Sequence, residues 1–289
     1  MVSVNRPLRP VTTRLFTALA LSVVTANAVP QAIRVEFTPP GNAACAVVSP
    51  DLGFLVSIRT DPAPLAKAYR ISSGQKSELV FSGQDQVTRL CFFRKPEPGA
   101  KASGLWVAGF GDGGPEDLRA ITDTKVIPCR FEKWVTRVGD KVLPLGLLAV
   151  SFREDLPPSG TPLVNSDGKI VGLIFQPSGP NAAYAIPAQA VHRVLRDVSR
   201  EGKLVRASLG FTLSTDSSVP RITRILPDSP AAMAGLRAND VLIKVGTYPT
   251  EGYPDAVNAL FYTVPGETVS FVLSRGNERI ERKVTPAVR

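Results

Sequence analysis

The chain has 289 residues and a formal net charge of +9; 44% of its residues are hydrophobic and 20% are charged. This length predicts two domains, and the composition is that of a chain that builds ordinary globular cores. No apolar run after residue 28 is long enough to cross a bilayer as a helix, so we expect no membrane span there.

The first 28 residues have the pattern of a signal peptide. Arg6, Arg9 and Arg14 form a basic start, Leu15–Val24 is apolar, and residues 26–28 read Ala-Asn-Ala, a small-residue cleavage pattern. An uncleaved anchor is the alternative. The segment holds three arginines and no acid, so a chain cut after residue 28 carries +6. We expect the mature protein to be exported, to the periplasm or outside the cell.

Residues 29–202 are predicted to form a mostly β unit. Short apolar runs separated by Pro, Gly and Asp turns are typical of a barrel or sandwich. The expected strands are Arg34–Phe37, Ala46–Ser49, Gly53–Ile58, Leu79–Ser82, Leu90–Arg94, Leu105–Gly109, Leu147–Phe152, Leu163–Asn165 and Ile170–Phe175. A closing helix is expected between Pro187 and Gly202, where apolar residues recur at helical spacing.

A basic cluster follows this helix into the next segment. It contains Arg193, Arg196, Arg200, Lys203 and Arg206, with no interleaved aromatic residue. We therefore expect a solvated helix face and no nucleic-acid partner.

Three cysteines, Cys45, Cys91 and Cys129, fit no zinc motif. Export permits one disulfide with one thiol left over, and three buried thiols are the alternative. No cluster has metal-ligand spacing, and we expect neither a metal nor a cofactor.

Residues 206–289 are predicted to form a compact α+β module. "ASLGFTL", "ITRIL" and "DVLIKVG" are typical of strands, and "SPAAMAGL" of a short helix that ends at Gly235. "YPDAVNALFYTV" predicts a second helix, and the last segment predicts a hairpin that turns at Gly276-Asn277.

Several of these segments resemble one family. "ILPDSPAAMAGLRANDVLIKVG" is similar to the family's "SPAAKAGLKxGDVI" segment, and "SGTPLVNSDGKIVGLIF" to its "SGGPLxNxxGxVVGI". The chain thus resembles the HtrA family, in which an exported trypsin-like serine protease domain precedes a PDZ domain. The resemblance implies a chymotrypsin/trypsin-like double β-barrel over residues 29–202 and a PDZ domain over residues 206–289.

The resemblance places Ser159 at the nucleophile position, but the positions of the family's catalytic His and Asp hold Thr60 and Arg89. A serine hydroxyl needs a base within hydrogen-bond reach and a group that orients this base. The chain's one histidine, His192, falls on the expected helix, and we interpret it as structural. Lys169, at an expected hairpin tip, is too solvated to replace it.

The position of an oxyanion-hole glycine holds Pro157, which has no N–H to donate. Loss of one oxyanion donor costs about 10²–10³ in rate. The sequence therefore predicts a degenerate protease site with no intact catalytic residue, and a structural role for Ser159 in the 156–162 loop.

The PDZ resemblance implies a groove that binds an extended peptide as an added strand. The segment Ser208-Leu209-Gly210-Phe211 would form the carboxylate-binding loop and the entry of the pocket. Leu209, Phe211 and Leu213 would alternate with Gly210 and Thr212, so that one of the two sets faces the pocket. The opposite wall would be Val257, Leu260 and Phe261 of the second helix. The other interpretation of these apolar residues is ordinary core.

Three functions follow from these expectations. The first is an exported HtrA-like pseudoprotease that binds peptides or protein C-termini, or an active HtrA-like protease, through its PDZ domain. The second is a divergent, weakly active serine endopeptidase that uses Ser159. The third is a structural, envelope-associated protein without a peptide ligand.

Overall fold

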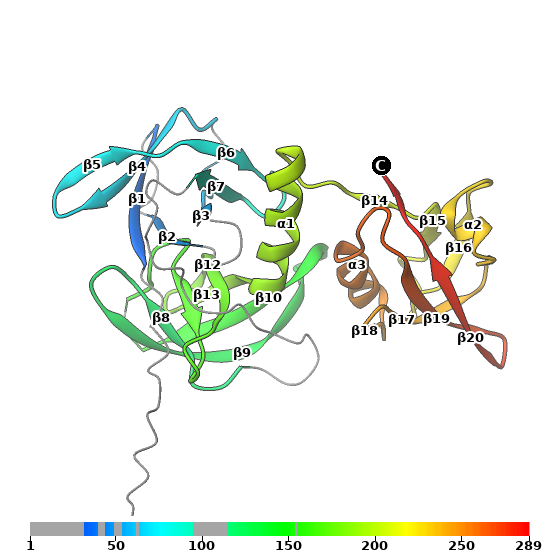
Figure 1. The fold of residues 1–289 in the computed structure, drawn as a ribbon. Helices are drawn as coiled ribbons and strands as arrows, with labels where there is room; N and C mark the ends of the chain where they lie inside the picture. The colour runs from blue at the N-terminus through cyan, green and yellow to red at the C-terminus, as the bar shows by residue number, and fades with distance from the viewer. Residues whose placement is uncertain are drawn as a thin grey trace, which may run out of the picture.

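The computed structural model describes residues 32–39, 44–48, 54–61, 64–94, 115–153 and 155–288, with residues 44–48 as backbone only. The leader segment and the expected strand Leu105–Gly109 lie outside these ranges. The described chain forms a β-rich unit, the helix α1 beside it, and a smaller second unit (Figure 1).

Seven antiparallel strands form the first sheet, in the order β5-β4-β1-β2-β3-β7-β6. They are β1 (Ile33–Thr38), β2 (Ala44–Val48), β3 (Phe54–Ile58), β4 (Lys67–Ser72), β5 (Gln75–Glu78), β6 (Phe81–Gln84) and β7 (Leu90–Arg94). The hairpin β4–β5 was not predicted, because its residues are mostly polar and β5 is exposed throughout. Its turn is made by Ser73 and Gly74, which both have positive φ.

Six strands form a closed barrel, in the order β10-β13-β12-β11-β8-β9. They are β8 (Arg119–Ile121), β9 (Val126–Val138), β10 (Lys141–Phe152), β11 (Pro162–Val164), β12 (Ile170–Gly179) and β13 (Ala182–Pro187). A wide bulge interrupts the β9–β10 ladder: Val142 pairs with Arg137, and the next pair is Leu147 with Val135. Residues 143–146 therefore face a single residue of β9, and we call them the β10 bulge.

The core has a layer inside each sheet and a third layer between them. Successive strand residues point to opposite faces. Leu55 of β3 accordingly packs inside the first sheet, whereas Val56 and Ile58 pack against the barrel. In the same way Leu148 faces the barrel interior and Leu147 the layer between the units. The predicted mostly β fold is confirmed. Of the two expected barrels, the described strands of the second form a closed barrel and those of the first a seven-stranded sheet.

Helix α1 (Ala188–Glu201) covers the layer between the two sheets with its apolar stripe. Pro187 is the residue before the helix rather than its first residue, because it still ends β13. Gly202 ends the helix in a left-handed conformation with φ 70°, and its N–H donates to the Val198 carbonyl at 3.0 Å.

The second unit has the predicted α+β content. Its strands form three small sheets, β14-β21, β15-β16 and β18-β17-β19-β20. They are β14 (Ala207–Ser208), β15 (Phe211–Leu213), β16 (Ile222–Ile225), β17 (Val241–Val245), β18 (Tyr248–Pro249), β19 (Val269–Arg275), β20 (Glu278–Val284) and β21 (Ala287–Val288). The helices are α2 (Pro230–Met233) and α3 (Tyr253–Phe261). The sequence predicted both helices and the hairpin that turns at Gly276.

The two units touch, and α3 faces the barrel side in Figure 1. The Gly146 N–H of the β10 bulge donates to the Asn258 side-chain oxygen on α3 at 2.6 Å. Phe261 and Tyr262 pack against the apolar layer beneath α1. The second unit is therefore docked on the first through α3.

A buried arginine joins α1, the linker and the end of α3. Arg193 is 5% exposed and forms an ion pair with Asp197 one helical turn later. Its guanidinium also donates to the Val205 carbonyl at 2.8 Å and to the Thr263 carbonyl at 3.2 Å. The expectation of a solvated basic helix face was thus wrong for Arg193, because the second unit covers it.

Candidate functional site: a serine loop and a helix-lined pocket

The loop that carries Ser159 is tied to the edge of β12. The Ser159 hydroxyl donates to the Phe175 carbonyl at 2.8 Å. The Gly160 N–H donates to the Ile174 carbonyl at 2.7 Å, and the Thr161 carbonyl accepts the Ile174 N–H at 2.9 Å. The hydroxyl hydrogen is thus directed at an amide oxygen, which is not a base at neutral pH.

Thr60 and Arg89 lie at neighbouring ends of β3 and β7. The Arg59 N–H donates to the Arg89 carbonyl at 3.0 Å, which holds the two segments together. Thr60 and Arg89 are both half-buried. A threonine hydroxyl and a guanidinium cannot accept a proton at neutral pH, so neither Thr60 nor Arg89 can act as a general base.

Two buried charged side chains stabilise the same corner. Asp85 accepts hydrogen bonds from the Thr88 N–H at 2.7 Å and its hydroxyl at 2.8 Å, and so closes the turn between β6 and β7. Arg59 is 2% exposed, and its guanidinium lies 3.8 Å from the Asp61 carboxylate. No pattern in the sequence predicted that Arg59 would be buried.

Pro157 is buried next to the serine turn. The Pro158 carbonyl accepts the Thr161 hydroxyl at 2.7 Å and the Thr161 N–H at 3.2 Å. The turn is therefore closed by its own residues, and Pro157 contributes no N–H to it. His192 lies half-buried on α1, and Lys169 pairs with Asp167 at 3.7 Å in the β11–β12 turn.

A small apolar hollow lies between the two sheets next to Phe175. Its volume is 60 Å³, and its lining residues are Val87, Thr88, Leu143, Pro144, Leu145, Leu147, Phe175 and Ile186. An engineered cavity of about 150 Å³ binds benzene, so this hollow is smaller than a site known to hold one aromatic ring.

The loop before β15 is held by hydrogen bonds to its carbonyl groups. The Leu209 carbonyl accepts the Ala231 N–H at 2.9 Å, and the Gly210 carbonyl accepts the Leu226 N–H at 2.8 Å. Within the described residues, neither N–H of this pair donates to a backbone carbonyl. Gly210 has φ 77°, and a Cβ there would lie 2.1 Å from the Ser229 Cβ, so only glycine fits.

One edge of β15 is unpaired in the described structure. Phe211, Thr212 and Leu213 pair with β16 on one side, in a two-stranded sheet. Phe211 and Leu213 are half-buried against the core of the second unit, whereas Thr212 is exposed. This edge leaves backbone groups available to an added strand.

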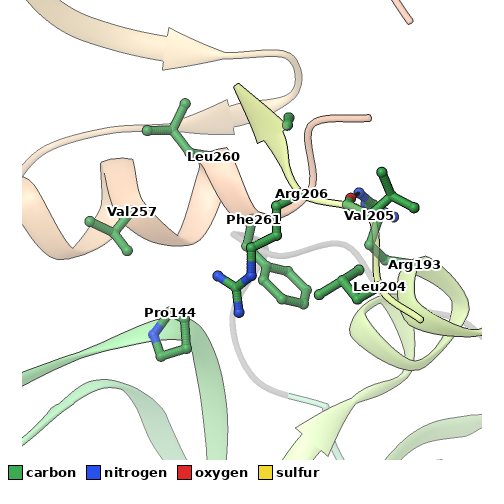
Figure 2. A pocket seen from close by; sticks show the side chains of 9 residues that line it. Pro144, Arg193, Leu204, Val205, Arg206, Val257, Leu260 and Phe261 are labelled. Atoms are coloured by element: carbon green, nitrogen blue, oxygen red, sulfur yellow. Dashed lines mark hydrogen bonds between the residues drawn. The ribbon is translucent and has the colours of Figure 1, made fainter. Parts of the chain in front are cut away.

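The three α3 residues that the sequence singled out line one pocket. Val257, Leu260 and Phe261 border a cavity of 160 Å³. Its other walls come from distant parts of the chain: Pro144, Arg193, Leu204, Val205, Arg206 and Ala207 (Figure 2). Sequence reasoning missed these other walls, because no local pattern links the β10 bulge to the linker. The predicted residues of β15 and its loop do not line this cavity.

The described cysteines and acidic residues form no metal site. No group of three or more His, Cys, Asp or Glu side chains converges within the described ranges. Cys91 and Cys129 are free thiols, and the Cys45 side chain lies outside the described part. Burial raises the pKa of both Cys91 and Cys129 to about 12, so neither is a thiolate nucleophile. No described helix is both long and apolar enough to span a membrane.

Comparison with known proteins shows which proteins this chain is similar to. Residues 207–285 match the PDZ domain family. The chain is 26% identical over 249 residues to a "Probable periplasmic serine endoprotease DegP-like" of Bartonella henselae, covering 78% of this chain and 44% of that protein. It is 28% identical over 148 residues to "Serine endoprotease DegS" of Haemophilus influenzae, covering 48% of this chain and 44% of that protein. The chain is thus similar to serine proteases of the HtrA family, and its second unit matches a PDZ domain.

Solved HtrA structures share the whole fold. "HtrA-type protease AlgW with tripeptide" superposes with a TM-score of 0.63 at 19% identity, covering 92% of this chain and 96% of the other. A serine endoprotease from Yersinia pestis gives a TM-score of 0.56 at 18% identity, covering 91% and 96%. The chain spans less than half the length of the curated relatives named above.

Proposed function

We propose that this protein is an exported HtrA-like pseudoprotease that binds peptides or protein C-termini through its PDZ domain. The observation that carries the first part is the hydrogen bond from the Ser159 hydroxyl to the Phe175 carbonyl. A nucleophilic serine donates to a base. Here Thr60 and Arg89 stand at the base and orienter positions, and neither accepts a proton.

Peptide binding is supported by the second unit. An unpaired β15 edge and a glycine-dependent loop are parts that an added peptide strand requires. Helix α3 adds an apolar surface at Val257, Leu260 and Phe261, in a pocket that β15 does not line. Two HtrA-type structures of this fold are titled as complexes with a tripeptide and a decapeptide. The alternatives are a weakly active endopeptidase and a structural protein with no ligand. An active HtrA-like protease is one partner that the PDZ domain could bind.

A fluorophosphonate probe tests the missing nucleophile. The chain from residue 29 is treated beside its Ser159→Ala variant and an intact trypsin-like protease. We expect neither form of this protein to be labelled while the control protease is labelled. Labelling of wild type that disappears in Ser159→Ala would show an activated serine and contradict the proposal.

Peptide capture tests the second part. The immobilised chain from residue 29 is exposed to decapeptide pools randomised at the last three positions. We expect enrichment of a subset, and its loss in Val257→Lys, which charges the α3 wall. Val126→Lys is the matched control, because Val126 is 54% exposed on β9. Absence of any enrichment would favour the structural alternative.

Export follows from the leader pattern and is consistent with the periplasmic proteins that the chain is similar to. N-terminal sequencing of the protein recovered from an exporting host tests it. We expect the mature chain to start at Val29.

A further inference from the structure

A second cavity lies along the linker, where the end of α1 meets the second unit. Its walls come from the last turn of α1, from residues 203–206, from the loop after α3 and from β21. We call it the linker cavity. In Figure 1 the linker crosses from α1 to β14 at this place, close to the C-terminal end of the chain. The linker cavity has a volume of 570 Å³ and is open to solvent.

Three exposed cations line the linker cavity. They are Arg200 at the end of α1 and Lys203 and Arg206 in the linker. None of the three forms an ion pair or a side-chain hydrogen bond with another described residue. Cations that gather around a concave surface raise the local concentration of anions. The linker cavity is therefore a place where an anion is favoured.

Acidic side chains offset only part of this charge. Asp197 lines the cavity, but its ion pair with Arg193 neutralises it. Glu201 is the other carboxylate of the lining, and it is exposed. The three cations and this single carboxylate leave an excess of two positive charges. A phosphate monoester carries about −1.5 to −2 at pH 7 and accepts bidentate hydrogen bonds from arginine, so it matches this excess better than a singly charged anion does.

An apolar strip lines the same cavity. It consists of Leu204 in the linker, Val264 and Pro265 after α3, and Val288 on β21. Val288 is 69% exposed. A bare ion leaves this strip in water, whereas an organic substituent on the ion covers it and gains the free energy of apolar burial. The lining therefore favours an organic phosphate over inorganic phosphate.

We propose that the linker cavity binds phosphate monoesters that carry an apolar substituent. The phosphate lies at Arg200, Lys203 and Arg206, and the substituent lies on the apolar strip. Neither β15 nor the loop before it lines this cavity, so the site is separate from the proposed peptide binding. The same chemistry is present in a soluble organic phosphate and in the headgroup of a lipid such as phosphatidic acid.

The first test compares soluble probes on the chain from residue 29. Hexyl phosphate, hexyl sulfate and inorganic phosphate are titrated by isothermal calorimetry at about pH 8, where a phosphate monoester is a dianion. We expect hexyl phosphate to bind about tenfold more tightly than the singly charged hexyl sulfate, and more tightly than inorganic phosphate. Equal Kd values for hexyl phosphate and hexyl sulfate would overturn the proposal.

Acidification gives a second readout of the same site. The second pKa of a phosphate monoester is about 6, so at about pH 5 the probe carries one charge. We expect hexyl phosphate to lose its advantage over hexyl sulfate at this pH. An advantage that persists would show that the cations do not recognise the dianion.

A triple variant removes the three cations, and a control removes the same charge elsewhere. Arg200→Gln/Lys203→Gln/Arg206→Gln is expected to weaken binding of hexyl phosphate at least tenfold. The control substitutes three exposed cations of β9, none of which lines the cavity: Arg130→Gln, Lys133→Gln and Arg137→Gln. We expect the control variant to bind like wild type. Equal losses in the two variants would show a response to net charge alone and would overturn the site.

A substitution in the apolar strip tests the second part of the ligand. Val288→Gln is expected to reduce the preference for hexyl phosphate over inorganic phosphate. Val126→Gln is its control, because Val126 is 54% exposed on β9. An unchanged preference in Val288→Gln would contradict the role of the strip. If the triple variant does not fold, the comparison of hexyl phosphate with hexyl sulfate decides alone.

Vesicles distinguish the two sources of the phosphate. The chain from residue 29 is sedimented with phosphatidylcholine vesicles that contain or lack phosphatidic acid. Sedimentation that requires phosphatidic acid and disappears in the triple variant would identify a lipid headgroup as the ligand. Binding of hexyl phosphate without sedimentation would identify a soluble organic phosphate. Absence of both would overturn the proposal and leave the peptide-binding proposal untouched.

Discussion

Asp197 neutralises Arg193 within α1, and together they hold both backbone groups of Val205 in the linker. The Asp197 carboxylate accepts the Val205 N–H at 2.8 Å, and Arg193 donates to the Val205 carbonyl at 2.8 Å. The side chains are 4% and 9% exposed. The ion pair thus fixes where the linker leaves the helix.

Replacing Arg193 by Met is expected to destabilise the protein by about 3–5 kcal/mol, because Asp197 then remains buried and uncompensated. The double variant Arg193→Met/Asp197→Leu is expected to recover part of this loss. Urea unfolding measures both. Arg196→Met is the control: Arg196 pairs with Glu267, which is 61% exposed, so its loss is expected to cost less than about 1 kcal/mol. Equal effects at the two arginines would contradict the interpretation.

Ser159→Ala tests the structural role of the serine. Removal of the hydroxyl leaves the part-buried Phe175 carbonyl without this donor. We expect a loss of about 0.5–1.5 kcal/mol in unfolding free energy, measured by urea unfolding. Ser166→Ala, at an exposed position of the β11–β12 turn, is expected to have no measurable effect. A Ser159→Ala variant as stable as wild type would show that the hydrogen bond does not stabilise the loop.

Substitutions at two glycines of the PDZ domain distinguish the cost of backbone strain from the cost of a steric clash. Gly210 and Gly266 have φ 77° and φ 80°, but a Cβ at Gly266 meets no atom within 4 Å. Gly266→Ala is expected to cost about 1–2 kcal/mol from the positive φ. Gly210→Ala is expected to cost clearly more, because its Cβ collides with Ser229. Thermal unfolding measures the difference, and similar costs at both positions would contradict the close approach.

The ion pair between Asp240 and Arg275 predicts a pH dependence of PDZ stability. Burial raises the pKa of Asp240, but hydrogen bonds from the Arg275 side chain and the Arg237 N–H outweigh it and lower the pKa below its ordinary value of 3.8. A carboxyl with a lowered folded-state pKa stabilises the fold above its unfolded pKa. This stabilisation is lost as the pH falls through the folded value.

We therefore expect the contribution of this pair to the free energy of unfolding to be independent of pH above about pH 5. The contribution should decrease below about pH 4, and urea unfolding of the wild type measures it. Asp240→Asn is expected to be less stable at neutral pH and to lose less stability on acidification. Glu281→Gln, at an exposed position of β20, is the control. Parallel pH profiles of wild type and Asp240→Asn would rule out this role for the Asp240–Arg275 pair.

The parts of the fold predicted from sequence are those with local signals. Apolar runs such as Leu90–Arg94 predicted buried strands, and the spacing of valines predicted α1. The strands β9 and the first half of β10 were missed, because their exposed residues do not alternate cleanly and the β10 bulge breaks the period. The hairpin β4–β5 was missed because it buries few apolar side chains.

The candidate site shows the same division. The turn at Ser159 and the wall of α3 could be located along the chain from motifs. Pro144 and Arg206 could not, since they reach the pocket only when the domains dock. Asn258 likewise could not be recognised from the sequence: it is 1% exposed on α3 because its side chain is bonded to the β10 bulge of the other unit.

The β10 bulge also constrains chain length. Side chains of a strand alternate between faces, so a one-residue deletion after Val142 would exchange the directions of Leu147 and Leu148. Leu147 would then point into the barrel, and Leu148 toward the first sheet, unless the bulge shortened to absorb the loss. A shorter bulge would draw Gly146 away from Asn258. Related chains that keep this docked PDZ domain are therefore expected to have four residues between the pairs Val142–Arg137 and Leu147–Val135, whatever those residues are.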